Sequence, residues 1–156
     1  MPPARLTSAC WLLPDLGHYH HPRIRAAAAR GPVPAYVLEI HDRPGFAEFR
    51  YVPGTDADYA VEKVRGSIAS SLDRLRPSVV FLNGWMDRGA LAGLRWCQRS
   101  GTPAVVMSES TRHDAAPDDK QPDPGRPVRR PWWREAIKRR IVRQFSAALV
   151  GGAPHR

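Results

Sequence analysis

The chain has 156 residues, 42% of them hydrophobic, and a formal net charge of +9. This composition excludes an intrinsically disordered chain and suits one globular domain spanning residues 1–156. Its two cysteines, Cys10 and Cys97, are too few for a disulfide framework or a four-cysteine zinc site, so we expect buried free thiols. No segment is apolar over the ~20 residues of a membrane span, and the N-terminus lacks the features of a signal peptide, which predicts a cytoplasmic protein.

The first half of the chain predicts alternating strands and helices. An apolar run at 6–13 predicts a buried strand, and the alanine-rich stretch 20–30, ended by Gly31-Pro32, predicts a helix. Two further strands are expected at 35–40 and 46–52, the second half-exposed and at a sheet edge because its apolar residues alternate with polar ones. Apolar residues three and four apart, from Val61 to Leu72, predict a helix over 56–75.

The second half continues this alternation. Unbroken apolar runs predict buried strands at 79–82 and 103–107, with a helix over 87–99 between them. A Pro- and Asp-rich stretch at 114–131 predicts a mobile loop, which a helix over 132–145 and a short strand over 147–150 follow. The order β-α-β-β-α-β-α-β-α-β predicts an α/β fold, a Rossmann-like three-layer domain with a mostly parallel sheet. Because the pattern breaks off after Gly151-Gly152, we expect the chain to be part of a larger protein.

Polar residues follow three of the predicted strands, at the edge where open parallel sheets bind ligands. Gly17 would let a backbone approach a ligand, and the start of the next helix would favour an anion. Ligand contact and structural roles such as packing, capping or local hydrogen bonding both remain open for these residues. The candidate ligand-binding residues are Gly17, His18, His20, Asn83, Trp85, Ser108, Glu109, Arg112 and His113.

Several cofactor sites are disfavoured. The histidines at 18, 20 and 21 lie close together in sequence, but no second group of Cys, His or carboxylate residues completes a metal site nearby, so we expect no metal. The first predicted strand is not followed by G-x-G-x-x-G, which argues against a nicotinamide cofactor. A phosphate-binding loop ending in Gly-Lys-Ser/Thr and the G-x-S-x-G elbow of hydrolases are also absent from the sequence. We therefore expect no cofactor.

The helix predicted over 132–145 is basic and amphipathic. Trp133, Ile137, Ile141 and Phe145 form one stripe, which basic side chains flank. We expect this stripe to pack on the core with the basic side facing solvent. Contact with an anionic membrane surface at the inner face of the membrane is the alternative.

The succession of motifs resembles the N-terminal domain of a GT-B glycosyltransferase of family 4. The resemblance covers most of the chain and is strongest from residue 79 onward. It rests on 79–85 (VVFLNGW), 89–96 (GALAGLRW), 101–114 (GTPAVVMSESTRHD), 132–135 (WWRE) and 145–152 (FSAALVGG). Asn83-Gly84-Trp85 stands where many members of the family have a histidine-containing turn.

The resemblance implies two Rossmann-like domains that face a cleft, and sugar transfer with retention from a nucleotide-sugar donor to a sugar or lipid acceptor, usually without a metal. It implies that Gly17 and His18 lie near the donor diphosphate or the acceptor. Asn83, Ser108, Glu109 and Arg112 would line the acceptor side. The donor-binding glutamate pair of the family belongs to a C-terminal domain, which this sequence does not contain, so we expect these residues alone to be inactive.

A second hypothesis from another class of protein is a basic Rossmann-like binding module without catalysis. The charge of +9 favours an anionic partner, either nucleic acid or an anionic surface. Nucleic acid is the less favoured of the two, because the basic residues do not form a known nucleic-acid motif with interleaved aromatic residues.

Overall fold

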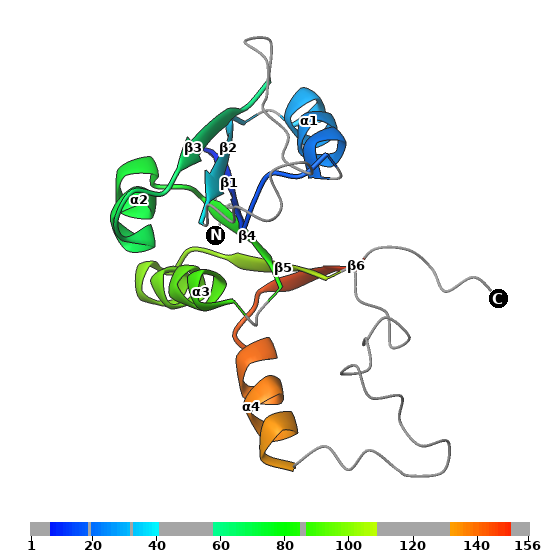
Figure 1. Ribbon diagram of the computed structural model, residues 1–156, viewed down its shortest axis with the longest axis vertical. Helices are drawn as coiled ribbons and strands as arrows, with labels where there is room; N and C mark the ends of the chain where they lie inside the picture. The colour runs from blue at the N-terminus through cyan, green and yellow to red at the C-terminus, as the bar shows by residue number, and fades with distance from the viewer. Residues whose placement is uncertain are drawn as a thin grey trace, which may run out of the picture.

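In the computed structural model, the described residues are 7–18, 20–31, 33–40, 58–84, 87–108 and 132–150. They form a six-stranded, entirely parallel sheet with helices on both faces, which confirms the predicted Rossmann-like α/β fold (Figure 1). The strands lie in the order β3-β2-β1-β4-β5-β6. In chain order the elements are β1 (Ala9–Leu13), α1 (His20–Arg30), β2 (Ala35–Glu39), β3 (Ala60–Lys63), α2 (Ile68–Leu75), β4 (Val79–Asn83), α3 (Arg88–Ser100), β5 (Ala104–Ser108), α4 (Trp132–Val142) and β6 (Ala147–Val150).

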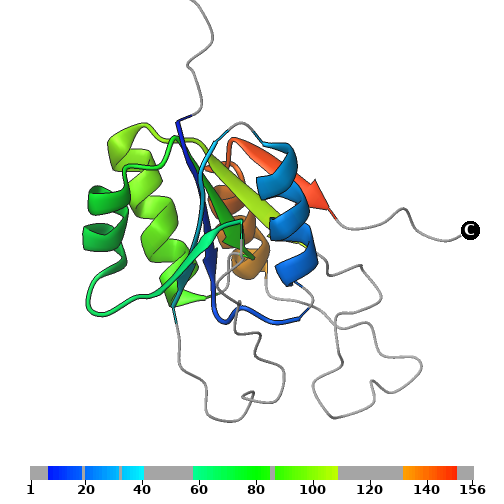
Figure 2. The same ribbon diagram turned by 90° about the horizontal axis from the view of Figure 1, so that it is seen from above.

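The core lies in two layers, one on each face of the sheet (Figure 2). In β1, Cys10 and Leu12 face the layer that α2 and α3 cover, and Trp11 and Leu13 face the layer that α1 covers. All five residues of β1 are buried, because a central parallel strand is covered on both faces. The continuous apolar run that predicted this strand therefore has a direct physical cause.

Helix α3 carries two glycines on its inner side, where the sheet leaves no room for a larger side chain. A Cβ atom on Gly93 would lie 2.5 Å from Leu12 Cδ2 and 3.0 Å from Leu82 Cδ2. A Cβ atom on Gly89 would clash with the side chain of Ile40. The helix is held at both ends: the Asp87 carboxylate accepts from the amides of residues 89 and 90, and Gly101 ends the helix at φ 71°.

The helix predicted over 56–75 is found only in its second half. The stretch 56–75 contains strand β3 and, after it, the shorter helix α2. Val61 belongs to the helically spaced apolar pattern that continues to Leu72, but the backbone of residues 60–63 pairs with the open edge of β2 instead. Gly66 then adopts a φ of 102°, and the Ser67 side chain accepts from the amide of Ser70 to begin α2. The tertiary pairing overrides the local periodicity.

The third strand of the described residues, β3, lies after the stretch 46–52 where a strand was predicted. The strand expected at 46–52, the loop expected at 114–131 and the turn at 151–152 lie outside the described residues. The edge strands among the described residues are β3 and β6, and β3 pairs with β2 alone. The described elements follow the order β-α-β-β-α-β-α-β-α-β, with the third strand formed by residues 60–63, where a helix was predicted.

The expected packing of the basic helix is wrong for half of its stripe. Ile141 and Phe145 contact the core, but Trp133 and Ile137 are 47% and 51% exposed. Helix α4 projects from the sheet in Figure 1, so its first turns lie beyond the reach of the core. Among the described residues, none of the helices has the length and apolar character that a bilayer-spanning segment requires.

Candidate functional site

The candidate site lies where the order of the strands reverses. Strands β1 and β4 are neighbours in the sheet, but the chain runs outward from β1 to β2 and β3 on one side, and from β4 to β5 and β6 on the other. The helices that follow β1 and β4 cover opposite faces of the sheet, and at such a point open α/β sheets typically bind ligands in a crevice beyond the carboxyl edge. Residues 14–18, His20, Asn83 and Gly84 stand at this point.

The turn after β1 is held by a buried carboxylate. Glu39, at the end of β2, is 4% exposed, and its Oε1 accepts a hydrogen bond of 2.8 Å from the amide of Leu16. Leu16 is itself fully buried in the layer under α1. The carboxylate and the leucine together fix the path of the chain just before Gly17 and His18, so the turn is built into the core.

The first amides of α1 are engaged within this turn. The Gly17 carbonyl accepts from the amide of His20 at 3.0 Å and from the amide of His21 at 3.2 Å. Pro22, the next residue of the helix, has no N–H group. These three positions therefore offer an anion no free backbone donor, so a ligand contact from them would come from side chains.

Two of these side chains meet across the crevice. His20 Nε2 and Asn83 Nδ2 lie 3.5 Å apart, the histidine in the first turn of α1 and the asparagine at the end of β4. Burial lowers the pKa of His20 below its ordinary value of 6.5, which favours the neutral ring. A neutral ring with its proton on Nδ1 leaves Nε2 able to accept from the Asn83 amide. In this state the pair is an uncharged contact between the start of α1 and the end of β4.

The neighbouring histidines turn away from this pair. His21 Nδ1 lies 2.5 Å from the hydroxyl of Tyr59, a residue that is 6% exposed and lies just before β3. His18 is exposed to solvent. Successive residues of a helix point about 100° apart, so His20 and His21 cannot face the same ion. Within the described residues, no group of three or more His, Cys, Asp and Glu side chains is arranged to hold a metal.

Gly84 continues the crevice after Asn83. Its φ is 77°, in the left-handed region that favours glycine, and its amide donates to the Met107 carbonyl at 2.9 Å. A Cβ atom at this position would have no heavy atom within 4 Å, so the side of the backbone where a side chain would stand is open. Gly84 is thus required for its backbone conformation and leaves space beside Asn83.

The other predicted site residues stand as follows. Ser108 is the last residue of β5, next to β4 in the sheet, and its backbone is all that the structure describes. Trp85, Glu109, Arg112 and His113 lie outside the described residues.

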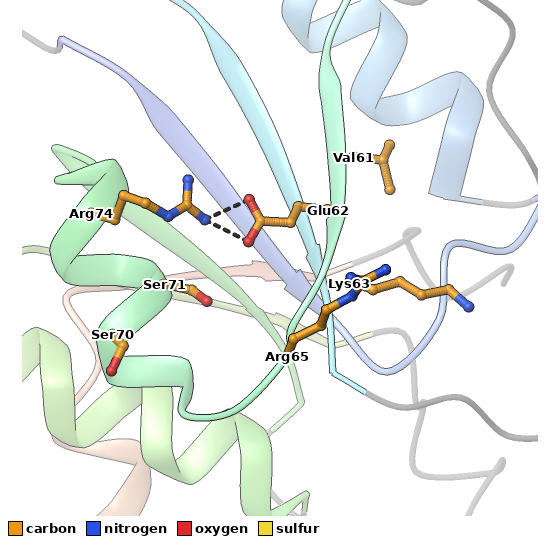
Figure 3. Close-up of a pocket in the computed structure, with 7 residues that line it drawn as sticks. All are labelled: Val61, Glu62, Lys63, Arg65, Ser70, Ser71 and Arg74. Carbon is orange, nitrogen blue, oxygen red and sulfur yellow. Dashed lines mark hydrogen bonds and ion pairs between the residues drawn. The ribbon is translucent and has the colours of Figure 1, made fainter.

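A second hollow lies at the edge of the sheet, between β3 and α2 (Figure 3). It has a volume of about 670 Å³, and the ion pair between Glu62 and Arg74 crosses it, with Arg74 Nη2 2.5 Å from both carboxylate oxygens. Lys63 and Arg65 point to the opposite side of β3 from this pair. Both members of the ion pair are about half exposed, and the hollow lies at the edge of the sheet, away from the β1–β4 reversal where open α/β sheets bind ligands.

No family model and no curated protein matches this chain. What is established is therefore the α/β fold and the geometry at its carboxyl edge.

Two residues of this region were not among the predicted site residues. Glu39 stands at the end of a strand whose other residues are largely apolar, and a carboxylate in such a run is a recognisable signal of a buried hydrogen-bonding role. Tyr59 had no such signal, because its contact with His21 spans 38 positions of the sequence. Neither residue faces the crevice as a ligand group; both hold the segments that do.

Proposed function

We propose that this domain is the acceptor side of a retaining glycosyltransferase that transfers a sugar from a nucleotide-sugar to a sugar or lipid acceptor. Two observations support the proposal. The strand order reverses between β1 and β4, and open α/β sheets typically bind ligands at such a point. The sequence also resembles the N-terminal domains of family 4 GT-B enzymes, and the residues that carry this resemblance include the end of β4.

The observation that carries the proposal is the pairing of His20 Nε2 with Asn83 Nδ2 at 3.5 Å. A sugar hydroxyl has one hydrogen to donate and two lone pairs to accept with. A hydroxyl that takes the place of the His20–Asn83 contact can donate to the unprotonated Nε2 atom and accept from the asparagine amide. An uncharged pair of this kind suits a hydroxyl better than a phosphate, and this favours the sugar acceptor as the group bound here.

The proposal requires a second set of groups for the donor. Transfer needs the donor and the acceptor to be held in one reactive geometry, and a single half of a cleft does not provide this. Under the proposal, a second domain grips the nucleotide-sugar, and residues 1–156 alone show negligible transfer. Turnover of a nucleotide-sugar by residues 1–156 would contradict this division of labour.

The proposal is tested by the sugar transfer of the full-length protein. A panel of nucleotide-sugars is offered with mixed sugar and lipid acceptors, and product is measured for the wild type and for His20→Ala and Asn83→Ala. Each substitution removes one hydrogen bond to the acceptor and leaves its partner unsatisfied, so we expect the KM for acceptor to rise about tenfold. The matched control is Arg99→Ala, an exposed position near the end of α3.

The outcomes separate the hypotheses. Absence of transfer with every donor, in a protein that is folded, would exclude the enzyme and favour the basic binding module. Transfer that His20→Ala and Asn83→Ala leave unchanged would keep the activity but move the acceptor away from the β1–β4 crevice. A rise in the KM for donor alone would assign the pair to the nucleotide-sugar.

A further inference from the structure

The exposed apolar residues of α4 do not belong to the candidate site and are not explained by packing within the described domain. Trp132 is 81% exposed, and Trp133 and Ile137 are about half exposed. Only the end of the helix reaches the core, through Ile141 and the following Phe145. Figure 1 shows the start of α4 as its end farthest from the sheet.

The same outward side of α4 carries a positive charge. Residues four apart lie on one side of a helix, so Arg140 follows Trp132 and Ala136 along one line of the surface. Arg139 and Arg143 form the adjacent line, and all three arginines are exposed. The acidic residue of the helix, Glu135, is partly buried. The exposed side of α4 therefore combines large apolar groups with three positive charges.

We infer that α4 docks on an anionic lipid membrane. Tryptophan side chains concentrate at the boundary between lipid headgroups and acyl chains, where the ring is in an apolar environment and the indole N–H stays near water. Arginines on the same side attract the phosphates of anionic lipids, and the charge of +9 adds to this attraction. The inference rests on α4 and the net charge, and is independent of the proposed enzyme activity.

The geometry favours a membrane over a nucleic acid. Helix α4 stands out from the rest of the described domain, with its first turn farthest from the sheet (Figure 1). Trp132, which is 81% exposed and on the same side as the three arginines, offers apolar area that a polar phosphate backbone would not cover. The apolar side chains would instead be buried in the outer part of the bilayer, where burial stabilises binding in proportion to area.

The experiment measures partitioning of the full chain onto vesicles by co-sedimentation. One set of vesicles is phosphatidylcholine alone, and the other is an equal mixture of phosphatidylcholine and phosphatidylglycerol. The first variant replaces Arg139, Arg140 and Arg143 with Gln. The matched control replaces Arg88, Arg95 and Arg99, three exposed arginines of α3, with Gln, so that both proteins lose the same net charge. Circular dichroism and thermal unfolding confirm that each variant is folded.

We expect binding to the anionic vesicles and not to phosphatidylcholine alone. Each arginine near the surface contributes about fivefold to partitioning, so the α4 variant should bind about a hundredfold more weakly. The α3 control should remain within a fewfold of the wild type. Trp132→Ala should weaken binding about tenfold, because it removes apolar area from the lipid contact.

Tryptophan fluorescence gives an independent readout, because the shift of the emission toward shorter wavelengths on binding should become smaller in Trp132→Phe. Equal losses in the α3 and α4 variants would overturn the proposal, since they would reduce it to an effect of net charge. Unchanged binding of Trp132→Ala would also overturn it. Salt-sensitive binding of a single-stranded or duplex oligonucleotide, without binding to anionic vesicles, would assign α4 to a nucleic acid instead.

Discussion

His20 Nε2 and Asn83 Nδ2 lie 3.5 Å apart across the crevice where the order of the strands reverses. The contact joins residues 63 positions apart in sequence and depends on the protonation of one ring. With a neutral ring, Nε2 can accept from the asparagine amide. With a protonated ring, Nε2 becomes a donor, so the contact persists only if the Asn83 amide turns to present its oxygen. The geometry of the His20–Asn83 contact therefore depends on pH.

We predict that stability falls as the pH is lowered through and below 6.5, and that His20 causes part of this loss. Burial lowers the folded-state pKa of His20, so between the folded and unfolded pKa values the unfolded chain binds one more proton. The stabilising effect is thus complete above the unfolded value of 6.5 and is lost as the pH falls toward the folded value. Urea unfolding of wild type and His20→Gln should show a smaller pH dependence in the variant. His18→Gln, in the same turn but exposed, is the control, and an equal effect of both substitutions would contradict the prediction.

We predict that Glu39→Ala destabilises the turn after β1. The substitution leaves the buried Leu16 amide without its acceptor at 2.8 Å, which should lower the free energy of unfolding by about 1–3 kcal/mol. Glu39→Gln retains a side-chain oxygen and should lose less. Urea unfolding gives the free energies, and hydrogen exchange at the Leu16 amide gives the local effect. Exchange that stays slow in Glu39→Ala would show that another group protects this amide.

We predict that Gly93→Ala destabilises the domain through overpacking. The added methyl group would lie 2.5 Å from Leu12 Cδ2, so α3 or the leucine must move. The expected cost is about 1–3 kcal/mol, even though alanine is the better helix former by about 1 kcal/mol. Thermal unfolding measures the change, with Arg95→Ala on the exposed side of the same helix as control. A gain in stability would mean that α3 can shift outward at little cost.

We predict that both cysteines are unreactive in the folded protein. Burial raises the pKa of Cys10 to about 12 and that of Cys97 to about 11, so very little thiolate exists at neutral pH. A thiol reagent should react slowly with the native chain and rapidly with both thiols in urea. Ser100→Cys, which adds an exposed thiol to α3, should react at once and so shows that the reagent is active. Rapid labelling of the wild type would indicate that the core opens easily.

The sequence by itself determined the strands at the centre of the sheet and the two ends of helix α3. Strands β1 and β4 are buried on both faces, so they appear in the sequence as unbroken apolar runs. Asp87 and Gly101 cap α3 through interactions with residues at most four positions away. Burial on both faces and local capping leave a pattern in consecutive residues, and such patterns can be read without the fold.

Only the tertiary structure decided which of two local patterns prevailed and which distant residues met. Val61 belongs to a helically spaced apolar pattern, but residues 60–63 pair with the edge of β2. Trp133 belongs to the apolar stripe of α4, but it is 47% exposed because it lies beyond the core. The contact of His20 with Asn83 follows from the neighbouring positions of β1 and β4, which the order of elements along the chain does not specify. The physical reason is that pairing with an open strand edge, coverage of a helix side and contacts between strand ends depend on neighbours far away in sequence.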